Sequence, residues 1–180
     1  MGWRKSLEPV ATGPLIARAP DYAEPVRAWR LWEVGNVDAA PRLRSLYRIC
    51  FWPVGEPFEA RCEAHRFRLR RRARHEAPTA TCTCGVYAVP FELIRKLALH
   101  DRLPQGRSLV IGAVSLWGDV LECESGWRAA LAYPHRLFIP LTCADVEEKA
   151  AGLMDYGVPV ELLDTRSVTD ALDTVAGLAA

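Results

Sequence analysis

The first half of the chain alternates between hydrophobic and polar positions in several short runs, a pattern typical of β-strands. Residues 26–34 (VRAWRLWEV) place apolar side chains on both faces and predict a buried strand. A turn is expected at Gly35 and Asn36. Residues 43–52 (LRSLYRICFW) predict a second strand, and residues 61–75 alternate in part, as in an exposed edge strand or an extended loop.

The longest alternating pattern spans residues 108–139 and predicts a β-hairpin, with its turn at Glu124-Ser125-Gly126. Glycines at 112 and 118 are suited to bulges, and Pro134 predicts a bend in the return strand. The apolar residues that should share one face of the first arm are Val110, Val114, Leu116 and Val120.

Helical spacing of apolar residues replaces this alternation in three places. Residues 90–101 predict a helix that begins at Pro90. Thr142 with Asp145 predicts the capped start of a second helix, and Ser167 predicts the start of a last one. Between these two helices, the sequence VPVELLD predicts a strand.

These elements predict an α+β fold. We expect a bent antiparallel sheet or small β-barrel, one helix that crosses it, and a C-terminal αβα extension. Residues 1–25, with recurring prolines and no periodicity, are expected to form an irregular arm. Residues 26–141 form the core domain in this interpretation, and residues 142–180 form the extension, packed on the core.

The composition is that of a folded protein, with 50% hydrophobic and 25% charged residues and a net charge of +1. The charge is unevenly distributed, because residues 41–75 hold ten Arg against three Glu, whereas residues 141–180 hold eight acids against two basic residues. No signal peptide and no apolar stretch long enough to cross a membrane are apparent. We therefore expect a cytoplasmic protein with reduced cysteines and no membrane partner.

Three cysteines and a histidine surround the basic segment and predict a metal site. Cys62, His75, Cys82 and Cys84 have the spacing Cys-x12-His-x6-Cys-x-Cys. They could supply the four ligands of a tetrahedral Zn²⁺ if a turn brings the last two sulfurs to the same side. His65 and Cys50 are possible substitutes in this ligand set.

Two other interpretations of the same residues remain open. The thiols could simply be buried beside a core histidine. Alternatively, Cys84 or Cys82 could be a nucleophile with His75 as base and with Glu76 or Asp119 orienting the histidine. An enzyme is the less expected outcome, because these residue types occur together in most proteins.

The arginines between Cys62 and His75 predict a partner with negative charge. Their number is sufficient to contact a phosphate backbone, although a solvent-exposed loop or a site that docks a protein partner would have the same composition. The candidate nucleic-acid-binding residues are Arg66, Arg68, Arg70, Arg71, Arg72 and Arg74.

Aromatic residues on the predicted strands suggest a pocket, since they could stack a base or hold a cation. Core packing is the more usual role of tryptophans. The candidate pocket residues are Trp29, Ser115, Trp117, Trp127 and Tyr133.

Several short motifs together resemble a family of small bacterial proteins that has no assigned activity. The motifs are Trp29-Arg30-x-Trp32, His75-Glu76-Ala77-Pro78, Cys82-x-Cys84-Gly85-x-Tyr87-Ala88, Leu116-Trp117-Gly118, Gly126-Trp127-Arg128-Ala129 and Ala132-Tyr133-Pro134. The resemblance covers residues 26–141 and implies only that the thiols, the hairpin and the first strand belong to one unit.

The sequence therefore favours a non-enzymatic binding module with a zinc-held Cys/His knuckle and an arginine-rich surface for nucleic acid. A protein–protein adaptor or assembly subunit is the first alternative. It would dock through the basic segment, the N-terminal arm and the acidic tail. A thiol-dependent enzyme that uses Cys84 and His75 is the second.

Overall fold

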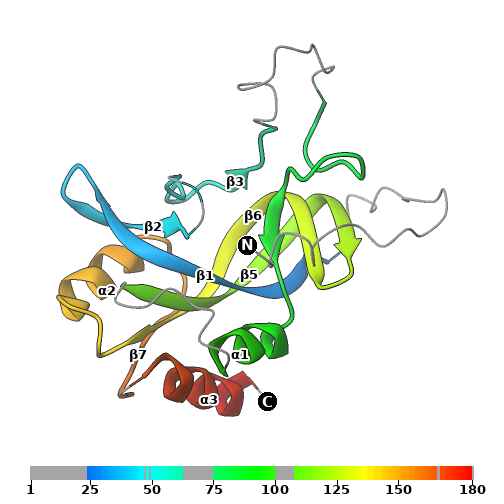
Figure 1. Cartoon of the computed structure of the whole chain (residues 1–180). Coiled ribbons are helices and arrows are strands. Elements are labelled where there is room, and N and C mark those ends of the chain that lie inside the picture. The colour runs from blue at the N-terminus through cyan, green and yellow to red at the C-terminus, as the bar shows by residue number, and fades with distance from the viewer. Residues whose placement is uncertain are drawn as a thin grey trace.

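The computed structural model describes residues 24–46, 48, 50–62, 75–99, 108–165 and 167–179. Figure 1 shows the arrangement of the helices and strands in these residues. In chain order the elements are β1 (Val26–Val37), β2 (Ala40–Ser45), β3 (Phe58–Glu59), β4 (Val86–Ala88), α1 (Phe91–Leu99), β5 (Leu109–Cys123), β6 (Gly126–Pro140), α2 (Val146–Met154), β7 (Val160–Leu163) and α3 (Val168–Ala179).

The strands form one bent sheet with the order β2-β1-β5-β6-β3, and β4 and β7 also pair with β6. Strand β6 has room for all three short strands on one side because each pairs with a different stretch of it. The β6–β7 pair is parallel and the other pairs are antiparallel. The predicted α+β class with a bent sheet is confirmed, and the sheet does not close into a barrel.

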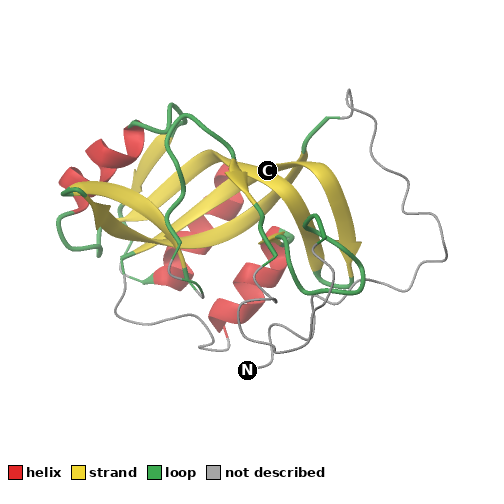
Figure 2. Cartoon of the chain, turned by 90° about the horizontal axis from the view of Figure 1, so that it is seen from above, coloured by secondary structure: helices red, strands yellow, loops and turns green. Residues whose placement is uncertain are grey.

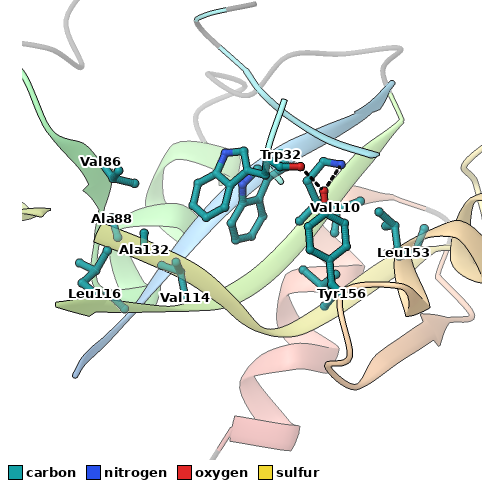
Figure 3. Close-up of a cluster of buried hydrophobic side chains, with 14 of the residues drawn as sticks. Trp32, Val86, Ala88, Val110, Val114, Leu116, Ala132, Leu153 and Tyr156 are labelled. Atoms are coloured by element: carbon teal, nitrogen blue, oxygen red, sulfur yellow. Dashed lines mark hydrogen bonds between the residues drawn. The ribbon is translucent and has the colours of Figure 1, made fainter. Parts of the chain in front are cut away.

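The two faces of the sheet bury separate hydrophobic clusters. Helices α1 and α3 lie together on one face, where they cover Leu31, Ile111 and Phe138 (Figure 1). The opposite face buries Trp32 and Trp52, whose rings meet edge to face at 5.2 Å between centroids. Figure 3 shows part of this second cluster. The alternation predicted for the hairpin is confirmed, since all four residues assigned to one face of β5 belong to the Trp32 cluster.

Backbone irregularities in the hairpin occur where the glycines and the proline predict them. The pairing of β5 with β6 shifts register between Ala113 and Val114, opposite Pro134, and again around Gly118. Gly112 permits a close approach of the two strands, because a Cβ there would lie 2.6 Å from the carbonyl oxygen of Arg136. Figure 2 shows the resulting curvature of the long strands.

The turn after β1 was predicted at the wrong position. Strand β1 continues through Gly35 and Asn36, and the hairpin turn is formed by Asp38 and Ala39, both with positive φ. Two positive φ values are the geometry of a type I′ turn, which matches the twist of a two-stranded hairpin. Ala39 gave no signal, because alanine is not a typical residue in that conformation.

The second predicted strand is also shorter than expected. Strand β2 ends at Ser45, and the chain then reverses so that the N–H of Ser45 donates to the carbonyl of Cys50 at 3.0 Å. The reversal returns Trp52 to β2, where its N–H donates to Leu43 and its indole N–H donates to the hydroxyl of Ser45. Burial of the Trp52 ring, which is 1% exposed, explains why the apolar run does not remain one straight strand.

Residues 142–179 form α2, β7 and α3, and several contacts attach them to the rest of the structure. Strand β7 joins the sheet beside β6, and α3 packs against α1. Beyond α2, the hydroxyl of Tyr156 donates to the carbonyl of Trp52 at 2.8 Å and accepts from the N–H of Leu43 at 3.1 Å (Figure 3).

The two predicted helix starts differ in outcome. Ser167 caps α3, because its hydroxyl accepts the N–H of Asp170 at 3.0 Å. The cap predicted for α2 is wrong, since Asp145 adopts a left-handed conformation and makes no side-chain capping bond. Of the predicted arm, only Glu24 and Pro25 lie among the described residues.

Candidate metal centre

The four predicted metal ligands converge at one edge of the sheet. Cys62 follows β3, and the other three residues lie in the loop of residues 75–85 that leads into β4. Both strands pair with β6, which brings the two chain segments together. The Sγ atoms of Cys62, Cys82 and Cys84 and a ring nitrogen of His75 all lie within 4.8 Å of one another. They could therefore hold one metal ion.

The cysteines of this cluster are thiols and not a disulfide. The Sγ atoms of Cys62 and Cys82 are 3.7 Å apart, whereas a disulfide bond is about 2.05 Å long. All six cysteines of the chain are free. Cys50, considered as a substitute ligand, does not belong to the cluster.

A turn allows Cys82 and Cys84 to face the same point. The N–H of Cys82 donates to the carbonyl of Thr79 at 3.2 Å, and β4 begins only after Gly85. Gly85 has a φ of +123°, and a Cβ at this position would lie 3.0 Å from the Cβ of Arg128. A glycine is therefore needed directly after the second sulfur for the turn to fit against β6.

Arg128 of β6 hydrogen bonds the backbone of this turn, although it was not among the predicted site residues. Its Nη1 donates to the carbonyl oxygens of Cys82 and Cys84, the latter at 3.0 Å, and its Nη2 donates to that of Thr79 at 3.4 Å. The side chain is 0% exposed. The available signal was an arginine in the otherwise largely apolar return strand of the hairpin, at a position that pairs with Tyr87.

The histidine is oriented by the backbone beside it. Nδ1 of His75 lies 3.2 Å from the carbonyl oxygen of Glu76. Because a carbonyl can only accept, Nδ1 carries the proton in this hydrogen bond and Nε2 carries the lone pair that can bind a metal.

The protein environment affects the two neighbouring thiols in opposite ways. Burial raises the pKa of Cys84 to about 11, and the neighbouring sulfurs of Cys82 and Cys62 add to this effect. Burial also acts to raise the pKa of Cys82, but hydrogen bonds from the backbone of Cys84 and from the thiol of Cys62 outweigh it and leave the pKa below its ordinary value. Without a bound metal ion, Cys84 is therefore a protonated thiol at neutral pH, which does not favour it as a nucleophile.

The candidate nucleic-acid-binding arginines lie outside the described residues, and so does His65. What the structure describes is the two ends of their segment. Cys62 immediately precedes it and His75 immediately follows it, and both belong to the metal cluster.

The candidate pocket residues do not all come together. Trp29 packs with Phe91 and Phe138 in the cluster that α1 and α3 cover. Trp127 and Tyr133 pack against the Trp32 cluster. Ser115 and Trp117 are half-buried on β5. The aromatic side chains thus contribute to two cores, and a ligand-binding pocket formed by them stays a prediction.

Comparisons with protein-family models, with curated proteins and with solved structures found no match to this chain. In the described part of the chain, no helix is sufficiently long and apolar to span a membrane. The functional interpretation therefore depends on the geometry of the Cys/His cluster.

Proposed function

We propose that this protein is a non-enzymatic binding module in which a structural Zn²⁺ at the Cys/His cluster fixes an arginine-rich segment that contacts nucleic acid. The observation that carries the proposal is the convergence, within 4.8 Å, of ligand atoms from both sides of that segment.

The donor set and its spacing support zinc. Three thiolates and one imidazole are a common ligand set of structural zinc sites. With Zn–S bonds of about 2.3 Å, two sulfurs at the corners of a tetrahedron lie about 3.8 Å apart. The separation of 3.7 Å between Cys62 and Cys82 is close to that value. Four protein ligands leave no open coordination position, so the ion would stabilise structure and not activate water.

The position of the arginines in the sequence supports the nucleic-acid part of the proposal. If Cys62 and His75 bind the same ion, the twelve residues between them form a closed loop with six arginines. Closing the loop reduces its conformational entropy before a ligand binds, and this lowers the cost of ordering the arginines on a phosphate backbone. Phosphate contacts of this kind release counterions and make binding strongly dependent on salt.

Elemental analysis of protein purified without added metal tests the zinc centre. We expect one zinc per chain, lost in Cys82→Ser and Cys84→Ala. The matched controls are Cys123→Ala and Cys143→Ala, which remove buried thiols outside the cluster and should retain the ion. An unaltered zinc content in both cluster variants would show that the ion binds elsewhere.

Fluorescence anisotropy with labelled single-stranded and duplex oligonucleotides tests the arginine segment. We expect affinity to fall steeply between 50 and 200 mM salt, with a slope of about −0.7 to −0.9 per phosphate contact. Replacing Arg70, Arg72 and Arg74 with Gln should lower the slope by about 2 to 3. The control replaces Arg27 and Arg48, which are exposed and lie outside the basic segment of residues 61–75. Absence of salt-dependent binding to either oligonucleotide, together with a protein partner that copurifies after nuclease treatment, would favour an adaptor instead.

A further inference from the structure

Arg128 is a buried cation, and no acidic side chain among the described residues forms an ion pair with it. In the part of the chain that the structure describes, its guanidinium donates only to carbonyl oxygens, those of Thr79, Cys82 and Cys84. Its Nε is buried without a hydrogen-bond partner. A charged group that is removed from water is strongly destabilising unless an opposite charge lies close to it. A source of negative charge near the thiol turn would therefore stabilise the buried guanidinium.

The metal centre itself can supply that charge. Three thiolates, a neutral imidazole and a divalent cation together carry one net negative charge. Arg128 carries one positive charge and touches the backbone of two of the cysteine ligands. With the metal bound, the four ligands, the ion and Arg128 together are neutral. With the thiols protonated and no metal, the guanidinium alone is charged.

We infer that Arg128 is the charge partner and positioning residue of the metal centre, which is built for a divalent cation held by three thiolates and one imidazole. This inference rests on the proposed function and deepens it. A neutral ligand set, or a trivalent ion with the same ligands, would leave the guanidinium without its counter-charge.

The hydrogen bonds explain how Arg128 also positions the ligands. In a trans peptide the C=O and the N–H point in opposite directions. When Arg128 binds the carbonyl of Cys82, the N–H of Thr83 in the same peptide is directed to the other side, away from the guanidinium. Arg128 thereby fixes the orientation of the peptides that follow Cys82 and Cys84, and with them the turn that carries both sulfurs.

Zinc affinity, measured by competition with a chromophoric chelator, provides the first test. We expect Arg128→Met to weaken zinc binding by about 10- to 100-fold. Arg128→Lys keeps the charge and should lose less. The matched control is Arg42→Met, because Arg42 also donates to backbone carbonyls, those of Pro41 and Gly152, but contacts no residue of the cluster. It should bind zinc as the unmodified chain does.

A series that changes the charge of the site separates the electrostatic role from simple support of the turn. His75→Cys adds a negative charge to the loaded site, and Cys62→His removes one. The fold-loss caused by Arg128→Met should be largest with His75→Cys, intermediate in the natural site and smallest with Cys62→His, where only the loss of the hydrogen bonds to the turn remains.

The outcomes of these experiments are distinct. Equal losses in all three backgrounds would leave Arg128 as a hydrogen-bonding support and overturn the charge role. Unchanged zinc affinity in Arg128→Met, with the natural chain still loading zinc, would overturn the inference and leave the proposed function intact. Failure of the natural chain to load zinc would overturn both. Circular dichroism shows whether Arg128→Met folds. If it does not, the same series is carried out with Arg128→Lys, and zinc affinity should then fall only slightly in all three ligand backgrounds. A fall of 10-fold would contradict the inference.

Discussion

The sheet and the loop of residues 75–85 are stabilised by different interactions. The hairpin of β5 and β6 buries apolar side chains on both faces, so its stability comes from area removed from water. In the loop, only Ala77, Pro78 and Cys84 are buried, and the other residues are half-buried or exposed. Ordering a residue costs roughly 1–2 kcal/mol of backbone entropy. The loop recovers little of this cost from apolar burial, so its order should depend on Arg128 and on the proposed metal ion.

Removal of the metal should therefore loosen the loop and leave the sheet intact, and this is the largest effect that we expect. After chelation we expect the backbone amides of residues 75–85 to lose protection from hydrogen exchange, because the ligands no longer hold the turn. Amides of β5 and β6 that pair away from the loop should remain protected. Hydrogen exchange followed by mass spectrometry measures both regions in one experiment.

Cys84→Ala should reproduce the effect of the chelator, and Cys143→Ala should not, since Cys143 is a buried thiol of the sheet core. If the loop amides keep full protection in the metal-free protein, the difference between the two regions does not exist.

The reverse perturbation should affect the sheet alone. Phe138 is 1% exposed and stacks near Trp29, with 6.1 Å between ring centroids. Phe138→Ala should lower the free energy of unfolding by about 3–5 kcal/mol, because it removes apolar contacts and leaves a cavity. Urea denaturation gives the change in stability, and elemental analysis should still find one zinc per folded chain.

Leu178→Ala is the matched control, since Leu178 is 48% exposed. Its effect should stay within about 0.5 kcal/mol. Loss of zinc from folded Phe138→Ala protein would show that the core and the metal centre are coupled.

The share of the structure that the sequence could predict differs between the two regions, and the reason is physical. Alternation along β5 predicted its two faces because both faces are buried and the side-chain period of a strand is fixed. The spacing of the thiols predicted a cluster that could hold a metal ion, because a turn after Cys82 can bring both nearby sulfurs to one point. The tertiary contacts of Arg128 could not be predicted in the same way, since they depend on the register that places it opposite Tyr87.

The errors in the β1–β2 region have a similar cause. Asp38 and Ala39 form a turn without the glycine that usually marks one, and Trp52 leaves its expected strand because its ring packs against Trp32. The position of Trp52 is decided by a contact with a residue far away in the sequence and not by local preference.

Gly126 joins the two regions, so its substitution should affect both. It starts β6 beside β4 with a φ of +147°. A Cβ there would collide with the carbonyl oxygen of Ala88 and lie 2.9 Å from the Cα of Val89. Gly126→Ala should cost about 1–3 kcal/mol in stability. It should also weaken zinc binding, because the β4–β6 register positions Arg128 under the thiol turn.

Gly157→Ala separates the steric effect from the conformational one. Gly157 also has a positive φ, +66°, but a Cβ there would meet nothing within 4 Å. This variant should lose about 1 kcal/mol and bind zinc normally. Equal zinc affinities in the two variants, measured by chelator competition, would contradict a role for the β4–β6 register in the metal centre.

The smallest expected effect tests whether α3 contributes to the stability of the sheet without affecting the metal centre. Ser167→Ala removes the hydroxyl that accepts the N–H of Asp170 at the start of α3. We expect a loss of about 1 kcal/mol in urea denaturation, because that donor would lose its partner in the helix. Zinc affinity should not change, since α3 packs against α1 on the face of the sheet that buries Phe138.

Thr142→Ala is the matched control, as α2 has no side-chain cap at Asp145, and it should change stability by less than about 0.5 kcal/mol. Equal losses in the two variants would mean that hydroxyl capping does not distinguish the two helices. A change in zinc affinity with Ser167→Ala would mean that the helical face and the metal centre are not independent.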